Sequence, residues 1–278
     1  MSVKIRNSFR YLVIDVNLDS GDITSIEEYT GIQIDEPKKA IIKLSELSEE
    51  DLHDLLGKCE YRFRKGIGYK GEYYLLKWKE CKDGKFYFYR HRKEGNKLKV
   101  DENSVLVLDE KDLKYVYPIV RGPNLTKEGF KWGEEYVIFP YEEGQKQPIS
   151  VDKFKKEAPN LYNYCNSIKT ELLKQSKYNQ RIQKVREFYG VIRVGEYTYG
   201  DLFVAIRDNT ELFPCIVRKI KTDWGKEKNP IFDNHIAYVR VSCEEEAEYL
   251  VSKLKDPKIT KLVSLLFDPR SISSRMPF

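Results

Sequence analysis

Apolar and polar positions alternate along much of the first third of the chain, a pattern typical of half-buried strands. The alternation predicts strands at residues 9–18 and 40–44. Two further strands, both rich in aromatic residues, are predicted from Glu72 and from Lys85. Asp83-Gly84 lies between these two strands and supplies the positive φ angles that a tight hairpin turn needs. The pattern therefore predicts a β-rich region that contains one well-defined hairpin.

Helices are predicted where apolar residues recur at three- and four-residue steps, and where capping residues occur. One apolar stripe predicts a long helix from about Leu161 into Val185. The stripe consists of Leu161, Cys165, Ile168 and Leu172. Capping residues predict a short helix after Ser48 and two C-terminal helices, which begin near Ser242 and Pro257.

Four more strands are predicted before the C-terminal helices. They cover residues 188–194, 201–207, 213–220 and 236–241. Together these elements indicate an α+β fold with mixed, largely antiparallel sheets, a long basic helix and C-terminal helices. A boundary is predicted near residues 108–113, where apolar SVLVL gives way to charged DEKDL. It would separate a β-rich region, 1–110, from an α+β region, 111–278; a single composite domain is the alternative.

Composition limits the classes of protein that need to be considered. The chain has 278 residues, 41% hydrophobic and 33% charged, which is typical of a globular protein. Its net charge of +5 is a modest basic excess, so an anion-binding surface would have to be local. The five cysteines are odd in number and lack a CxxC pair, which favours a reducing cytoplasm over a disulfide framework or a zinc site. No apolar run indicates a signal peptide or a membrane span.

The densest chemistry lies between Tyr117 and Tyr141. Gly and Pro in the segment Arg121-Gly122-Pro123-Asn124 predict a sharp turn after an apolar strand. Arginine can bind a phosphate or the edge of guanine, and asparagine can pair with adenine. Alternatively, Arg121 pairs with a nearby carboxylate and Asn124 satisfies its own turn. The residue types alone favour this second interpretation.

Two other basic segments are candidates for phosphate contacts. One face of the predicted long helix carries Lys174, Lys177, Arg181 and Lys184, spaced 3, 4 and 3 residues apart. The other segment carries Arg218, Lys219 and Lys221, and continues with Trp224, Lys226 and Lys228. For the helical face, a solvated charged surface is the structural alternative.

Several catalytic chemistries are not supported by the residues. The GxGxxG pattern at residues 66–71 is followed by a predicted strand instead of the helix that a pyrophosphate site requires. His53, His91 and His235 lie far from the cysteines in sequence, which argues against a metal centre or a Cys-His nucleophile. A metal-dependent nuclease stays open as an alternative, although no clear carboxylate cluster is visible.

The order of the central segments resembles a known family. YPIVRGPNL, followed by Trp132 and YVIFPY, resembles the signature of the TaqI-like specificity domain of adenine-specific DNA methyltransferases and fused restriction-modification enzymes. The basic helix, FYGVIRV, PCIVRKI, PIFDN and EEEAEYLVSKL are similar in order and spacing, so the resemblance covers about residues 61–267. The fragment NPIF at Asn229 lacks the second proline of the methyltransferase Asn-Pro-Pro-aromatic motif.

The resemblance implies a target recognition module that binds double-stranded DNA, reads bases in the major groove, and has no catalytic residues of its own. S-adenosylmethionine would bind to a separate methyltransferase catalytic domain or subunit, which would be the protein partner. The resemblance assigns DNA contacts to Arg121 and Asn124, with Trp132 supporting the turn by packing. A protein-interaction module or inactive remnant is the remaining alternative.

Overall fold

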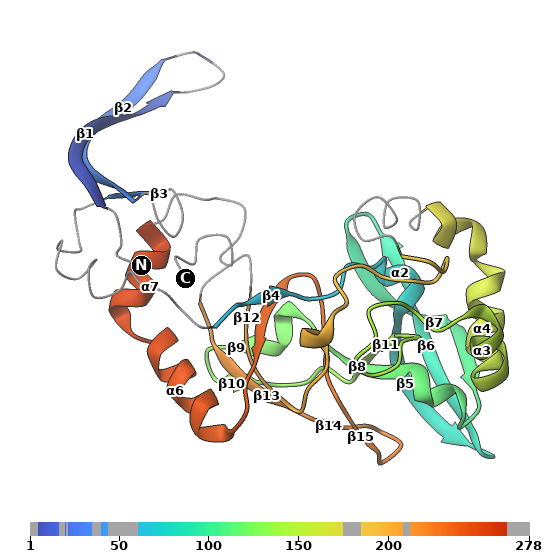
Figure 1. The fold of residues 1–278 in the computed structure, drawn as a ribbon. Coiled ribbons are helices and arrows are strands. Elements are labelled where there is room, and N and C mark those ends of the chain that lie inside the picture. The colour runs from blue at the N-terminus through green and yellow to red at the C-terminus, as the bar shows by residue number, and fades with distance from the viewer. Residues whose placement is uncertain are drawn as a thin grey trace. The chain divides into compact units, whose positions relative to one another are not determined.

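The structure is a computed structural model that describes residues 5–16, 20, 22–34, 40–43, 61–174, 185–207 and 212–265 (Figure 1). The chain forms two compact units. The central unit comprises residues 64–207 and 213–248, and the terminal unit comprises the described parts of residues 1–63, 208–212 and 249–278. The expected boundary at 108–113 is therefore wrong as a division between compact units, because the strands on either side of it share one sheet of the central unit.

The terminal unit contains a three-stranded antiparallel sheet in the order β1-β2-β3. Its strands are β1 (Ile5–Val16), β2 (Ile23–Ile34) and β3 (Ala40–Lys43). The strands expected at residues 9–18 and 40–44 are thus confirmed, whereas β2 was not anticipated. The helix expected after Ser48 lies outside the described residues.

Both C-terminal helices are confirmed. They are α6 (Glu244–Leu254) and α7 (Pro257–Leu265). Three glutamates occupy the first turn of α6, where they favour the positive end of the helix dipole. Proline is well tolerated at the first position of α7 because its missing N–H would have no partner within the helix.

The main sheet of the central unit has six strands in the order β16-β8-β11-β5-β6-β7. Their bounds are β5 (Leu75–Lys82), β6 (Lys85–Glu94), β7 (Lys97–Leu108), β8 (Val116–Val120), β11 (Glu135–Ile138) and β16 (Ile231–Phe232). All pairings are antiparallel except that of β16 with β8. The predicted hairpin is confirmed, since Asp83 and Gly84 have φ angles of 50° and 70°.

A second sheet has the order β13-β12-β17-β4. Its strands are β4 (Arg64–Lys65), β12 (Leu202–Arg207), β13 (Cys215–Arg218) and β17 (Ile236–Arg240). Two short ladders accompany the sheets: β9 (Leu125–Thr126) with β10 (Gly129–Phe130), and β14 (Ile220–Lys221) with β15 (Glu227–Lys228).

Residues 64–68 join the two sheets, and this explains the glycine pattern there. After β4 pairs with β17, the N–H of Ile67 donates to the carbonyl of Phe232 in β16 at 2.8 Å. A Cβ at Gly66 would lie 2.2 Å from that carbonyl oxygen, and one at Gly68 would lie 2.6 Å from the side chain of Ile192. The glycines therefore permit close packing. Contrary to expectation, the next residues form a one-turn helix, α2 (Gly71–Tyr74), before β5 begins.

The helical segment after the main sheet differs from the prediction of one long helix. It begins with α3 (Val151–Glu157) and α4 (Pro159–Ser167). The hydroxyl of Ser167 donates to the carbonyl of Tyr164 at 2.7 Å, and Ile168 leaves helical geometry at φ −109° and ψ 19°. Helical structure resumes over residues 169–174, and residues 175–184 lie outside the described part. A continuous helix from Leu161 is therefore wrong.

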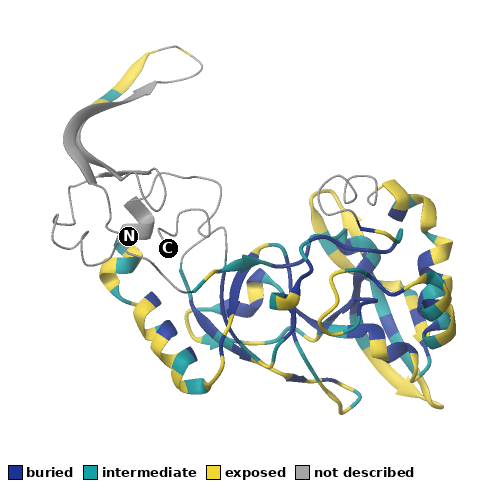
Figure 2. Ribbon diagram, in the orientation of Figure 1, coloured by how far each residue is buried: buried dark blue, intermediate teal, exposed yellow. Residues whose placement is uncertain are grey.

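Figure 2 shows the buried residues of the central unit, and the largest of its fully buried side chains are all tyrosine or phenylalanine. One core gathers around Phe88 and Tyr136, and Trp224 packs against both rings at centroid distances of 5.9 and 4.7 Å. A second core lies against the other sheet, where Phe232 stacks on Tyr238 at 4.2 Å. Short 3₁₀ turns connect strands near both cores: η1 (Asp112–Tyr115), η2 (Gly122–Asn124) and η3 (Glu196–Thr198).

Candidate functional site

The turn predicted after β8 is present, and we call residues Arg121–Asn124 the signature turn. The N–H of Asn124 donates to the carbonyl of Arg121 at 2.9 Å. In return, the N–H of Arg121 donates to the side-chain oxygen Oδ1 of Asn124 at 2.7 Å. Asn124 is only 7% exposed. Its amide therefore satisfies the turn, as the structural alternative proposed, and is not presented to a base.

The guanidinium of Arg121 is held by a carboxylate from β11. Its Nη1 donates to Glu135 Oε1 at 2.8 Å and to Oε2 at 2.9 Å. His91 Nε2 lies 2.9 Å from the same Oε1. Burial alone would raise the pKa of Glu135, but hydrogen bonds from His91 and Arg121 hold it below its usual range. The pair is therefore ionised at neutral pH, and Glu135 fixes the orientation of the arginine.

This ion pair uses only one of the three guanidinium nitrogens. Within the described residues, Nε and Nη2 of Arg121 donate to no acceptor, and the side chain is 25% exposed. Arg207, at the end of β12, lies beside the same turn: a Cβ at Gly122 would be 3.6 Å from Arg207 Nε. No carboxylate in the described part of the chain pairs with Arg207. Two guanidinium groups thus flank the signature turn, which is an arrangement suited to an anion or a purine edge.

The parallel pairing of β8 with β16 places Asp233 next to Arg121 in the sheet. Phe232 lies opposite Val120, so the residue after each strand emerges at the same edge. Asp233 is committed to other donors, because it accepts from the hydroxyl of Tyr69 at 2.8 Å and from the N–H of His235 at 3.0 Å. Within the described residues, Asp233 forms no ion pair with Arg207.

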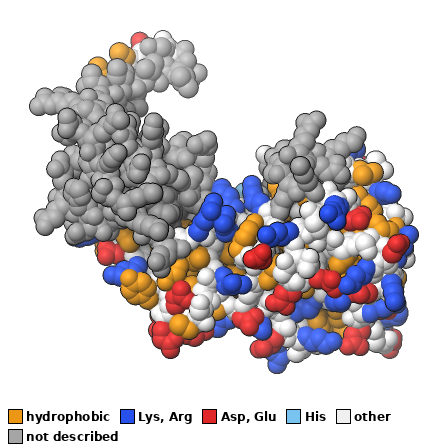
Figure 3. Space-filling model, viewed as in Figure 1, with side chains coloured by type: hydrophobic (Ala, Val, Ile, Leu, Met, Phe, Trp, Pro, Cys, Tyr) orange, Lys and Arg blue, Asp and Glu red, His pale blue; other side chains and the backbone are white. Residues whose placement is uncertain are grey.

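Further cations lie on the second sheet near Arg207. Figure 3 shows Lys and Arg side chains gathered over β4, the strand Arg64–Lys65. Strand β17 pairs with β4 on one side and with β12 on the other, with Ala237 opposite Lys65 and Ile236 opposite Arg207. Two strand spacings separate β4 from β12, or about 10 Å. The signature turn therefore lies at the margin of a basic surface.

Trp132 has the packing role that was expected of it. Its ring meets Tyr136 edge-on at a centroid distance of 5.2 Å and an interplanar angle of 89°. It is partly buried and packs against both cores of the central unit. The indole N–H has no hydrogen-bond acceptor among the described residues. The ring thus supports the segment that follows the signature turn.

Four of the other predicted phosphate contacts lie in the described residues, and three of these four are paired with carboxylates. Arg218 binds Glu244 through two hydrogen bonds of 2.6 Å. Ion pairs of 2.7 and 3.0 Å join Lys174 to Glu171 and Lys219 to Asp201. Lys221 is exposed, and no carboxylate within the described ranges pairs with it. Lys177, Arg181 and Lys184 lie outside the described residues. Only Lys221 among these is an uncompensated cation in the described structure.

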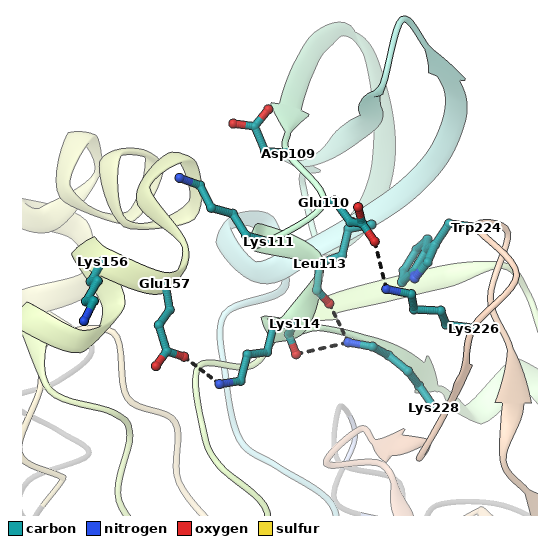
Figure 4. A pocket seen from close by; sticks show the side chains of 10 residues that line it. All are labelled: Asp109, Glu110, Lys111, Leu113, Lys114, Lys156, Glu157, Trp224, Lys226 and Lys228. Atoms are coloured by element: carbon teal, nitrogen blue, oxygen red, sulfur yellow. Dashed lines mark hydrogen bonds and ion pairs between the residues drawn. The ribbon is translucent and has the colours of Figure 1, made fainter.

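A second feature, which the sequence did not indicate, is a pocket of about 860 Å³. We call it the lysine pocket (Figure 4). It is lined by Asp109, Glu110, Lys111, Leu113, Lys114, Lys156, Glu157, Trp224, Lys226 and Lys228. These residues come from three segments that are far apart in the chain, so no local motif could have revealed the pocket.

The described residues include no group of three or more His, Cys, Asp or Glu side chains that could hold a metal ion. They also include no helix with the length and apolar character needed to cross a membrane. A comparison of the chain with protein-family models and with curated proteins finds no match.

Proposed function

We propose that this chain is a recognition module for a specific sequence in double-stranded DNA. It would serve an adenine-specific DNA methyltransferase or a restriction-modification system, and its own residues would carry no catalysis. Methyl transfer from S-adenosylmethionine would take place in a separate catalytic domain or subunit, which would be its partner. The observation that supports this proposal best is the pair of guanidinium groups at the signature turn.

The geometry of Arg121 is suitable for DNA recognition. Glu135 holds Nη1, so the guanidinium is already oriented while Nε and Nη2 remain available. An oriented guanidinium loses less conformational entropy when it binds, and it can donate two hydrogen bonds to guanine or to a phosphate. Arg207 adds a second cation beside it. In this proposal Asn124 shapes the turn and does not contact DNA.

The basic surface supports the same proposal. Lys and Arg side chains over β4 would attract the phosphate backbone, while Arg121 and Arg207 approach the base edges or adjacent phosphates. The overall charge of +5 is small, so this attraction has to come from the local arrangement.

The proposal can be tested by measuring binding of a fluorescent duplex at several salt concentrations. We expect affinity to fall as salt increases, because bound cations release counterions from DNA. Arg207→Gln should weaken binding by about 1 to 3 kcal/mol. Arg92→Gln is the control, because Arg92 is 61% exposed and lies on β6 of the main sheet, whereas Arg207 lies on the second sheet. Equal effects of the two substitutions, or no binding of the parent protein at low salt, would contradict the proposal.

A further inference from the structure

The lysine pocket is formed by three segments of the central unit. The first, residues 109–114, follows β7, the second is the end of α3, and the third is the β14–β15 hairpin. Figure 4 shows Lys226 and Lys228 extending from the hairpin toward the first segment, and Lys114 extending toward Glu157 of α3. The pocket therefore concentrates side chains that no single element carries.

Positive charge exceeds negative charge in this pocket. Five lysines and three carboxylates line it. Lys114 pairs with Glu157 at 2.6 Å, and Lys226 pairs with Glu110 at 3.0 Å. The third carboxylate, Asp109, is already bound by Lys85 and Asn160, neither of which lines the pocket.

Three of the five lysines are consequently left without a carboxylate. Lys111 and Lys156 are exposed and pair with none in the described part of the chain. Lys228 is held instead by backbone carbonyls. Its Nζ donates to the carbonyls of Leu113, of Lys114 at 3.0 Å and of Val116 at 2.8 Å.

Lys228 is the cation that would benefit most from a bound anion. Burial, together with the nearby charge of Lys226, lowers its pKa to about 7. Its ammonium also lies 4.3 Å from the centroid of the Tyr117 ring. The carbonyls and the ring fix its position, yet they supply no full negative charge. An anion in the pocket would supply that charge.

We infer that the lysine pocket binds the phosphate groups of a nucleotide through hydrogen bonds from Lys111 and Lys156. Lys228, whose three N–H groups already donate to carbonyls, contributes positive charge. Because cations from three segments line the pocket, a ligand with more than one negative charge would be favoured there. Lysine is a common phosphate ligand. A volume of about 860 Å³ exceeds that of a single phosphate and lies within the range of small-molecule sites. The partly exposed ring of Trp224 provides an apolar wall for the rest of the nucleotide.

The same phosphate chemistry is available from a nucleotide in solution or from a DNA strand. The experiment therefore has two arms, both with the full chain. In the first, isothermal titration measures binding of ADP, with adenosine as the uncharged control. In the second, fluorescence anisotropy measures binding of a short duplex. Each arm uses the parent protein, the double variant Lys111→Gln/Lys156→Gln and a control, Lys146→Gln. Lys146 is 63% exposed, pairs with Glu196 and does not line the pocket.

We expect saturable ADP binding, no adenosine binding, and at least about tenfold weaker ADP binding in the double variant, since each charged contact contributes more than a neutral one. The control should match the parent protein. If ADP does not bind but the double variant weakens duplex binding to the same extent, the phosphate belongs to DNA and the inference still holds. If ADP binds and the duplex does not, the inference stands while the proposed function fails. Unchanged binding of both ligands by the double variant overturns the inference.

Discussion

Replacing Arg121 with alanine would remove the guanidinium that neutralises Glu135. The carboxylate would keep His91 as a partner but would lose two hydrogen bonds of 2.8 and 2.9 Å. The two side chains are 25% and 18% exposed. The pair is therefore more buried than a surface pair and less buried than a core pair. Surface pairs contribute about 0 to 1 kcal/mol, and disruption of a buried pair costs about 3 to 5 kcal/mol. We therefore expect Arg121→Ala to lower the free energy of unfolding by about 2 kcal/mol.

Urea unfolding followed by tryptophan fluorescence would measure this change, with a thermal melt as a second readout. For a unit of this size, a loss of about 2 kcal/mol corresponds to a decrease in Tm of roughly 4 to 8 °C. The matched control is Arg218→Ala, which disrupts a two-hydrogen-bond pair whose side chains are 56% and 46% exposed. Its cost should stay below about 1 kcal/mol.

The pH dependence gives an independent check on the same pair. The pKa of Glu135 is below its usual value, so its ion pair stabilises the fold above the ordinary carboxyl pKa of 4.5. This contribution is lost as pH falls through the folded-state pKa, and the difference between Arg121→Ala and the parent protein should shrink in acid. An Arg121→Ala cost no larger than that of Arg218→Ala at neutral pH would refute the reasoning.

Three further substitutions test the fold. Gly66→Ala would place a Cβ 2.2 Å from a backbone carbonyl oxygen, so we expect a loss of more than about 2 kcal/mol in urea unfolding; wild-type stability would contradict the close approach of the strands. Trp224→Ala should cost about 2 to 3 kcal/mol and reduce near-UV circular dichroism, because the ring packs against Tyr136 at 4.7 Å. The pKa of Lys228 is about 7 in the folded protein and 10.5 for an ordinary lysine. Between pH 7 and pH 10.5 the unfolded chain therefore binds more protons than the folded protein. The free energy of unfolding of the parent protein should therefore rise with pH in this window, by at most about 1.4 kcal/mol per pH unit. Lys228→Met should remove the rise, and parallel stability profiles of the parent and the variant would contradict the lowered pKa.

Elements governed by local chemistry could be predicted from the sequence. The β5–β6 hairpin depends on the conformations of Asp83 and Gly84, and both are determined mainly by neighbouring residues. The helix beginning at Pro257 depends on a capping preference of the same local kind. The helix break at Ile168 was missed, because the apolar spacing continues through it while Ser167 bonds to the preceding turn.

Pairings between distant segments could not be predicted. The parallel alignment of β16 with β8 joins residues more than 100 positions apart, and no local pattern encodes it. The same alignment, with Ile67 beside β16, explains why Gly66 has to be glycine. The sequence showed the glycine pattern, but the reason for these glycines lies in tertiary packing.

In the candidate site, too, features set by neighbouring residues were predicted, and contacts between distant segments were not. The position of the signature turn was predicted, and so was the possibility that Asn124 satisfies it. Glu135 could not be identified as the partner of Arg121, nor His91 as the second partner of Glu135, because these residues lie on separate strands of the sheet. Arg207 reaches the turn only through the arrangement of the second sheet. Lys226 and Lys228 belong to a basic segment that the sequence indicated, but the other lysines of the lysine pocket carried no recognisable motif.

The most direct test of the account is selection of bound duplexes from a random-sequence DNA pool at moderate salt, followed by sequencing of the retained fraction. If the chain is a sequence-specific recognition module, one short motif should be enriched, and Arg207→Gln should reduce that enrichment at a defined position. Retention of DNA without any enriched motif, or no retention at low salt, would contradict the central claim.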